Sequence, residues 1–354
     1  MKAKKNIAKF AAVLLLISNV LIFSACGKEE EFINDDDTIK IGLILETMTV
    51  ERWQRDRDVF VARAKELDAE VIVTNAYEDA ERQNKLIREL VAQGVDVLAI
   101  VAYDKETLSD SIKYAHDNNV KVIAYDRLIS EANVDLYISF DNYEVGRLIG
   151  QSAVDNVPEG KYLILNGART DSNAYMLNEG CMSILQPYID EGKIEVVDET
   201  WIEAWRDEVS YKYVNDAIES GLEFDVIIAA NDRVAEGALN ALSEYRMIDD
   251  VYITGQDAEL AACQRIVEGI QDMTVYKPIS VLAEGAAEIA VKMAKGESIG
   301  PCDLIDDGKY KVKYIAYEPI AVNKDNMLDT VIKGGFYPIE QVYANIDKED
   351  WPIP

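Results

Sequence analysis

Polar side chains that form several directed hydrogen bonds recur at the ends of the strands predicted from this sequence. Arg52 and Trp53 follow the first predicted strand, Asp126 and Arg127 follow the fourth, and an Asp-Ser-Asn stretch at 171–173 follows a later one. Asp accepts hydrogen bonds, Arg donates them and Asn does both, so such a set suits a ligand with many hydroxyl groups. An indole can pack on an apolar C–H face. Hydroxyls around an apolar ring face describe a sugar, and sugars are therefore the ligand class that these residues indicate.

The candidate contacts share one position, within a few residues of a strand's carboxyl end. In doubly wound α/β folds, ligands bind beyond the carboxyl ends of the parallel strands. Hydrogen bonds to charged groups are worth roughly 1.5–3 kcal/mol each, so the charged members of the set matter most. The predicted ligand contacts are Arg52, Trp53, Asp126, Arg127, Asp171, Asn173, Trp205, Asn231, Asp257 and Lys277.

The elements that must position these residues follow a regular alternation of apolar runs and amphipathic stretches. Before residue 140, the pattern predicts strands at 39–45, 71–74, 97–102, 122–125 and 136–139, with helices near 51–67, 80–93 and 106–118. Continuous rather than alternating apolar runs indicate strands buried on both faces. Strand–helix–strand repeats imply a parallel sheet with right-handed crossovers.

A second set of the same kind follows. Its strands are predicted at 162–165, 194–197, 226–230, 251–254 and 273–276, and its helices at 142–155, 174–188, 206–220, 233–243, 258–268 and 279–295. The tail adds short strands near 312–316 and 320–322 and a helix near 324–332. The sequence therefore predicts an α/β fold with two doubly wound, Rossmann-like sheets in series.

The N-terminus indicates export and lipidation. A lysine-rich start is followed by an almost wholly apolar stretch at 10–23, which has the length of a signal-peptide core and is too short to span a bilayer. It ends in Phe-Ser-Ala-Cys-Gly, which resembles the lipobox of bacterial lipoproteins, with Cys26 as the acylated residue. We expect residues 1–25 to be a signal peptide and the acidic run at 26–37 to be a solvated tether. The predicted location is the extracytoplasmic face of the cell membrane, although an ordinary secretory signal with a chance Cys is the alternative.

Composition excludes several classes of function. The chain has 36 basic and 65 acidic residues and a formal net charge of −29, which disfavours nucleic acid as a partner. No Gly-rich phosphate-binding loop of the P-loop type and no dinucleotide fingerprint is present, and one His without a Cys/His cluster argues against zinc. Cys181 and Cys263 fall in helical patterns and are expected to be small buried residues. We therefore predict no cofactor, no metal and no catalysis.

The strand-end motifs, taken in order, resemble the bacterial D-xylose-binding proteins of the type I periplasmic-binding-protein superfamily. The resemblance runs from about residue 39 to 343 and rests on Glu-Arg-Trp-Gln at 51–54, Ala-Tyr-Asp-Arg at 124–127, Gly-Gln-Asp-Ala at 255–258 and Met-Thr-Val-Tyr-Lys-Pro at 273–278. It implies a monomeric receptor that captures a monosaccharide, most readily D-xylose, and delivers it to the permease and ATPase of an ABC importer. The loop at 46–49 is less acidic than is usual in this family and leaves the exact sugar open.

The resemblance also implies how the chain is divided. Two Rossmann-like lobes would be joined by a three-strand hinge with crossovers near 141–143, 276–278 and 317–319. The N-terminal lobe would comprise 38–142 plus 278–316, and the C-terminal lobe 143–277 plus 317–354. Trp53 and Trp205 would stack on the sugar, and Lys277 would bind it near the hinge.

Simpler roles remain open for several of these residues. Trp53 could belong to the core, Asp126 and Arg127 could form a surface ion pair, and Asp257 could cap a helix. Asp232 could either cap the helix predicted at 233–243 or contact the ligand. For the whole protein, the alternatives are a sensory module for another pentose or hexose, and a glycosidase that uses two carboxylates.

Overall fold

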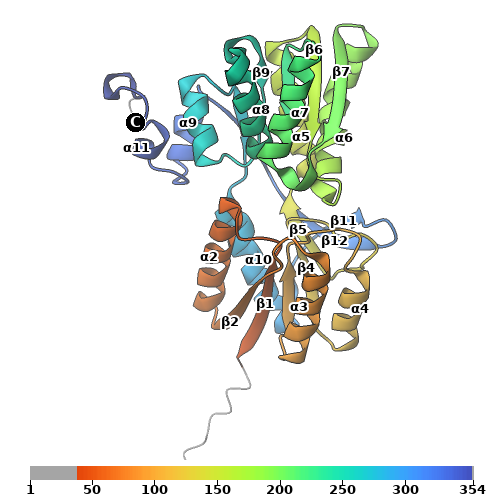
Figure 1. Cartoon of the computed structure of the whole chain (residues 1–354). Coiled ribbons are helices and arrows are strands. Elements are labelled where there is room, and N and C mark those ends of the chain that lie inside the picture. Colours follow the sequence, from red (N-terminus) through yellow and green to blue (C-terminus); the bar gives the residue numbers. More distant parts are fainter. Residues whose placement is uncertain (1–37, 353–354) are drawn as a thin grey trace, which may run out of the picture. The chain divides into compact units, whose positions relative to one another are not determined.

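The computed structural model describes residues 38–352, and the residues from Ile39 onward form one compact unit. The signal peptide, Cys26 and the tether predicted from the sequence lie outside the described residues. Within the described part, no helix has both the length and the apolar character needed to cross a bilayer. Figure 1 shows two groups of strands and helices in this unit, which we call the first and second lobes.

The first lobe is built on a seven-stranded sheet with the order β11-β12-β5-β4-β3-β1-β2. Its strands are β1 (Ile39–Leu45), β2 (Ala69–Asn75), β3 (Val97–Ile100), β4 (Lys121–Tyr125), β5 (Leu136–Phe140), β11 (Asp303–Asp306) and β12 (Lys311–Tyr317). All pairs are parallel except the one between β11 and β12. The central strands are buried on both faces, which is why they read as continuous apolar runs.

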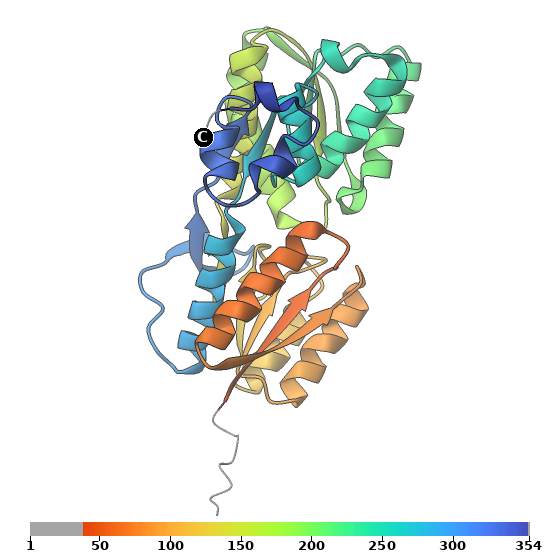
Figure 2. The ribbon, with the colours of Figure 1, turned by 90° about the vertical axis from the view of Figure 1, so that its left-hand side faces the viewer.

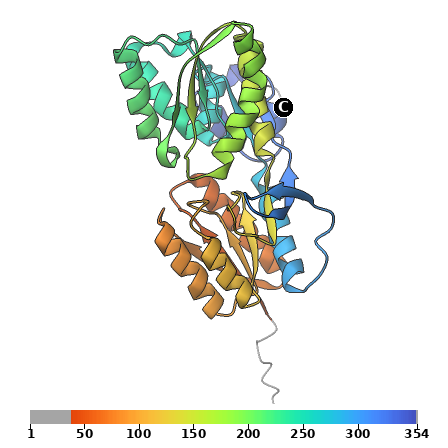
Figure 3. The ribbon, with the colours of Figure 1, turned by 90° about the vertical axis from the view of Figure 1, so that its right-hand side faces the viewer.

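Helices cover both faces of this sheet. On one face α2 (Glu51–Glu66) and α10 (Ile279–Ala294) pack against alternate residues of β1, including Ile41 and Leu43 (Figure 2). On the other face α3 (Ala80–Ala92) and α4 (Ser109–Asp117) pack against Ile44 and Leu98 (Figure 3). The sheet therefore sits between two helical layers, as expected for a doubly wound fold.

The second lobe repeats this plan around a parallel four-stranded sheet with the order β7-β6-β8-β9. The strands are β6 (Gly160–Asn166), β7 (Ile194–Trp201), β8 (Val226–Ala229) and β9 (Tyr252–Ile253). One face packs against α5 (Asn142–Asn156) and α6 (Ser172–Asp190), and the other against α7 (Asp207–Glu219) and α8 (Asp232–Tyr245). Two short 3-10 turns, η2 (Glu203–Trp205) and η3 (Ile248–Asp250), join these elements.

A small antiparallel pair, β10 (Met273–Tyr276) and β13 (Ile320–Asn323), extends the second lobe. It packs beside α9 (Leu260–Glu268) and the C-terminal elements η4 (Leu328–Ile332), α11 (Ile339–Val342) and η5 (Lys348–Asp350). The chain passes between the lobes after β5, after β10 and after β12.

Several boundaries differ from those predicted. The helix predicted at 106–118 begins at Ser109, the helix predicted at 258–268 begins at Leu260, and the strand predicted at 251–254 is only two residues long. The tail helix predicted near 324–332 is a π-helix at Leu328–Ile332, and β11 and α11 were not predicted. Cys181 and Cys263 are buried, as predicted.

Candidate functional site

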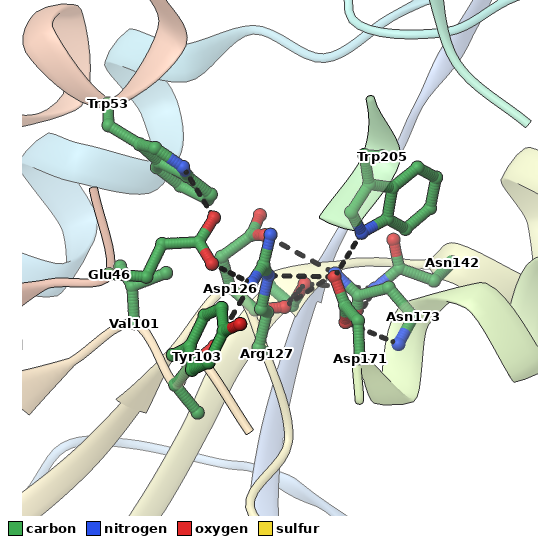
Figure 4. Close-up of polar contacts among 12 residues, drawn as sticks. Glu46, Trp53, Val101, Tyr103, Asp126, Arg127, Asn142, Asp171, Asn173 and Trp205 are labelled. Carbon is green, nitrogen blue, oxygen red and sulfur yellow. Dashed lines mark hydrogen bonds and ion pairs between the residues drawn. The ribbon is translucent and has the colours of Figure 1, made fainter. Parts of the chain in front are cut away.

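All of the predicted ligand contacts lie in the lining of one pocket that both lobes contribute to. The first lobe supplies Arg52, Trp53, Asp126 and Arg127, and the second supplies Asp171, Asn173, Trp205, Asn231, Asp257 and Lys277. The first and last of them, Arg52 and Lys277, are more than two hundred positions apart in the sequence. The carboxyl ends of the strands bring the whole set together. Figure 4 shows the part of this set that surrounds Arg127.

Arg52 opens α2 and is held by carboxylates from both lobes. Its guanidinium forms a close ion pair with Asp126, lies 3.5 Å from Asp257 across the pocket and is backed by Asp56 at 3.7 Å. Burial alone would lower the pKa of Arg52, but the three carboxylates outweigh it and raise that pKa. Arg52 is therefore a permanent cation whose side chain is buried in the lining of the pocket.

Asp126 and Arg127 are buried, with 2% and 7% of their surfaces exposed, so they are not the surface ion pair considered above. Arg127 donates from Nη1 to Glu46 at 2.5 Å and to the carbonyl of Ala102 at 3.0 Å, and its Nε lies 2.7 Å from Asp171 of the second lobe. The carboxylates raise the pKa of Arg127 against the opposing effect of burial. Arg127 thus spans the pocket, as Figure 4 shows.

The backbone at Asp126 is in an uncommon conformation. Its φ is 63°, in the left-handed region that few non-glycine residues occupy, although Asp tolerates it better than most. Its carbonyl accepts hydrogen bonds from Ser139 Oγ at 2.7 Å and Asn173 Nδ2 at 3.1 Å, which hold the turn in place. Strained backbone that is fixed in this way clusters at functional sites.

The second lobe presents groups that are fixed by helix starts. Asp171 is the N-cap of α6, where its side chain accepts from the Asn173 N–H at 2.9 Å, and Asn231 is the N-cap of α8, where it accepts from Val234 N at 2.9 Å. The possibility that Asp232 caps α8 is therefore wrong. Asp232 instead lies behind the pocket, where it accepts hydrogen bonds from Thr274 and Gln271.

Asp257 and Lys277 form an ion pair at 2.7 Å beside the strand connections, in which Lys277 is buried and Asp257 is 12% exposed. Burial would raise the pKa of Asp257, but Lys277 and Arg52 outweigh burial and lower it, so this carboxylate is ionised. Asp257 does not cap a helix: its φ is 93°, and α9 begins after Glu259.

The two indoles stand on different lobes. Trp53 packs in the core of the first lobe and also lines the pocket. It therefore has both the core role considered for it and the predicted place in the pocket. Trp205 donates from Nε1 to Asp171 at 3.2 Å and lies over Gly167, where a Cβ would come within 2.1 Å of its ring. Only glycine at 167 allows this indole to reach its place.

Sequence reasoning missed several lining residues, among them Glu46, Glu78, Tyr103, Arg233 and Gln256. Glu46 directly follows β1, and Tyr103 follows β3 within three residues. The rule that ligand contacts follow the carboxyl ends of strands, which we call the strand-end rule, could therefore have found both. Gln256 lies inside a motif already singled out. Its Oε1 is buried and has no hydrogen-bond partner from the protein, which leaves an acceptor free for a ligand.

The charges of the pocket are largely paired within the protein. Arg52 faces Asp126 and Asp257, Arg127 faces Glu46 and Asp171, and Lys277 faces Asp257. A ligand therefore meets alternating donors and acceptors rather than a net field of one sign. In the described part of the chain, no group of His, Cys, Asp and Glu is arranged to hold a metal ion.

A known protein family and individual known proteins match this chain over most of its length. The family described as "Periplasmic binding protein domain" matches residues 41–298. The chain is 42% identical to the D-xylose-binding periplasmic protein of Escherichia coli (strain K12), over 94% of this chain and 98% of the relative. It is 40% identical, with the same coverage, to the protein of that name from Haemophilus influenzae.

Solved structures show the same fold. A carbohydrate transporter solute-binding protein from Chloroflexus aurantiacus, in complex with D-glucose, is 25% identical with a TM-score of 0.80, and the match covers 86% of this chain and 98% of that one. An ABC transporter solute-binding protein from Clostridium phytofermentans with bound β-D-glucose gives 25% identity and a TM-score of 0.79, over 86% and 99% of the two chains. The predicted α/β fold with two doubly wound lobes is confirmed, and the relatives are binding proteins rather than enzymes.

Proposed function

We propose that this chain, which belongs to the periplasmic binding protein family, captures D-xylose in the pocket between its lobes and delivers it to an ABC importer. The observation that carries the proposal is the meeting of all the predicted sugar contacts in one pocket. The relatives that share 40–42% of the sequence are named for D-xylose binding, and they extend over nearly the whole chain.

The chemistry of the pocket supports an uncharged polyol as the ligand. Each hydroxyl of a sugar both donates and accepts, so it can insert between an Arg or Lys donor and a carboxylate acceptor without leaving either unpaired. A sugar phosphate would bring about two negative charges into the pocket. The Arg and Lys side chains there already pair with carboxylates, so no unpaired cation would neutralise the phosphate. We therefore expect a neutral monosaccharide and not an acidic sugar.

The two indoles support the same ligand class. Trp53 and Trp205 lie on the two sides of the Arg127–Asp171 pair (Figure 4), and each presents an aromatic surface to the pocket. The C–H faces of a pyranose pack on such surfaces. The remaining predicted contacts then reach its hydroxyls around the ring edge.

A thermal-shift panel of pentoses and hexoses tests the sugar. D-xylose is expected to raise the unfolding temperature in a concentration-dependent way, because a ligand that binds only the folded state stabilises it by mass action. Arg127→Ala is expected to abolish the shift. Stabilisation by ribose or galactose but not by xylose would contradict the substrate, and stabilisation by no sugar would contradict the function.

Lipid anchoring through Cys26 forms a separate part of the proposal and rests on the sequence alone. Two or more acyl chains hold a protein stably at a membrane, whereas one does so marginally. Cys26→Ser is expected to move the protein from the membrane fraction to the soluble one and to stop incorporation of a labelled fatty acid. A variant that stays in the membrane fraction would contradict the anchor.

The division into lobes at 38–142 plus 278–316 and at 143–277 plus 317–354 is likewise proposed, with the hinge at the three crossovers. A monomeric receptor that opens and closes at this hinge would release sugar to the permease. Small-angle scattering is expected to show one copy per particle and a smaller radius of gyration with D-xylose. An unchanged radius would contradict closure.

A further inference from the structure

Glu46 is a buried carboxylate that the predicted set of sugar contacts does not include. It directly follows β1, is 7% exposed and lines the pocket. Its Oε1 accepts from Trp53 Nε1 at 3.0 Å, and its Oε2 accepts from Arg127 Nη1 at 2.5 Å (Figure 4). One carboxylate therefore connects the indole and the guanidinium that the first lobe offers to the ligand.

We propose that Glu46 is a positioning residue for sugar binding, which fixes the orientation of Trp53 and Arg127 before the sugar arrives. This inference rests on the function proposed above. Each oxygen of Glu46 already accepts a hydrogen bond from the protein, one from Trp53 and one from Arg127.

The indole N–H explains why a carboxylate stands here. Trp53 is only 3% exposed, and a buried donor without a partner destabilises the folded protein. The hydrogen bond to Glu46 satisfies that donor and sets the rotation of the ring. The guanidinium carbons of Arg52 and Arg127 lie 4.6 and 5.6 Å from the ring centroid, so this rotation also aligns the ring with both cations.

The pairing of Arg127 shows when Glu46 matters most. Arg127 contacts two carboxylates, Glu46 of its own lobe and Asp171 of the other. If the lobes part, Asp171 moves away with the second lobe, and Glu46 is the carboxylate that stays beside Arg127. Glu46 would then keep this long side chain in its binding orientation in the open form.

Keeping a side chain ordered before binding removes a cost from the binding step. Ordering one rotamer-rich side chain during binding lowers affinity by about twofold to thirteenfold. Two side chains held by Glu46 correspond to an affinity loss of about tenfold when the carboxylate is removed. Because Glu46 acts through other residues, the loss should be the same factor for every sugar that binds.

The test uses Glu46→Gln in the full mature chain, with isothermal titration of D-xylose and of a second sugar that the wild type binds. Both affinities are expected to fall about tenfold with their ratio unchanged. The matched control is Glu66→Gln, which removes an exposed glutamate of the same lobe that pairs with Arg63, and its affinities should equal those of the wild type. A change of more than about fivefold in the ratio between the sugars would show a direct contact and overturn the proposal, as would unchanged affinities.

Tryptophan fluorescence of the sugar-free protein gives an independent readout. Glu46→Leu, which removes the acceptor of the Trp53 indole N–H, is expected to shift the emission, and the shift should be absent when Trp53→Phe is the background. If the shift persists there, or if none occurs, Glu46 does not orient the indole. This measurement needs no ligand, so it separates failure of the positioning role from failure of the proposed function. If Glu46→Gln does not unfold cooperatively, Glu46→Asp, which keeps the charge but shortens the reach, is measured in the same way.

Discussion

The two sides of the pocket hold their functional groups by different means. On the second lobe, Asp171 and Asn231 are N-caps of α6 and α8, so the backbone itself fixes their side chains. On the first lobe, Arg52 and Arg127 are long side chains held by ion pairs with carboxylates. One side is fixed by the starts of helices and the other by a network of charges.

This difference separates stability from affinity. A residue that caps a helix and also contacts a ligand carries both roles, so its removal weakens the fold as well as binding. A residue held only by buried charges mainly sets the electrostatics of the site, and its removal leaves a partner unpaired. Substitutions on the two sides should therefore give different combinations of unfolding temperature and affinity.

The largest effect is expected on the first-lobe side, from Arg127→Met. The substitution keeps an unbranched side chain but leaves Glu46 and Asp171 without their cation. Breaking a buried pair in this way costs about 3–5 kcal/mol of folding free energy, so the unfolding temperature should fall. Loss of the charged donor to the sugar is worth about 1.5–3 kcal/mol, so affinity for D-xylose should fall by roughly 10- to 150-fold by titration calorimetry. A loss of less than tenfold would mean that Arg127 is not a central contact.

A smaller, two-part effect is expected on the second-lobe side, from Asn231. Asn231→Ala removes the cap of α8 and should lower the free energy of unfolding by about 1 kcal/mol, while affinity falls about tenfold through the lost hydrogen bond. Asn231→Ser, which can still cap, is the matched control: stability should return to near that of the wild type while affinity stays reduced. If serine restored both, Asn231 would be a cap and nothing more.

The response of stability to pH should sharpen the same comparison. Burial raises the pKa of Asp56 in the first lobe to about 7, and in the second lobe it raises those of Asp232 to about 7 and Glu259 to about 8. Between their ordinary values near 4 and these values, the folded protein holds protons that the unfolded chain does not. Stability should therefore fall as pH rises from about 4 to 8 and level off above it.

Thermal unfolding of the sugar-free protein from pH 5 to pH 8.5 measures this slope. Asp232→Asn, whose side chain cannot ionise, should make this slope less steep, because Asp56 and Glu259 still contribute to it, whereas Glu66→Gln on the exposed surface should leave the slope unchanged. A protein that becomes more stable as pH rises across this interval would contradict the buried, protonated carboxyls.

The smallest effect is expected from the ion pair between Glu78 and Arg206, which joins the two lobes at 3.0 Å near the rim of the pocket. Both side chains are partly exposed, so the pair is worth about 0.2–1 kcal/mol, or roughly a 1.4-fold to fivefold effect on affinity. Arg206→Ala should show it at low ionic strength and lose it in about 1 M salt, where charges are screened within roughly 3 Å. Lys161→Ala, which breaks an exposed pair within the second lobe, should leave affinity unchanged at any salt concentration.

The strand-end rule explains how much of the site the sequence could predict. Strands buried on both faces leave clear apolar runs, and the polar residues after them fall at one edge of each sheet, which located the lining residues. Glu46 directly follows a predicted strand, so its place in the lining could have been predicted, but its pairing with Arg127, 81 positions away along the chain, could not. No local pattern records that pairing.

Two element boundaries differ from the prediction at places where a side-chain hydroxyl forms hydrogen bonds with the backbone. β9 ends at Ile253 because the hydroxyl of Thr254 takes the place of a strand partner, accepting from Ala229 N at 2.9 Å and donating to Ala229 O at 3.1 Å. Near η4, the Thr330 hydroxyl donates to the Asn326 carbonyl at 2.7 Å, where the helix widens to a π-helix. Such substitutions depend on single hydroxyl groups, to which hydrophobic periodicity is insensitive.

A crystal structure of the mature chain grown with D-xylose tests the central claim most directly. We expect one pyranose in the pocket, with an indole against its C–H face and with Glu46 still bonded to Trp53 and Arg127. Its hydroxyls should be hydrogen-bonded to Arg52, Arg127, Asn231 and Asp257. A sugar bound elsewhere, or a pocket that stays closed by its own ion pairs at saturating D-xylose, would contradict it.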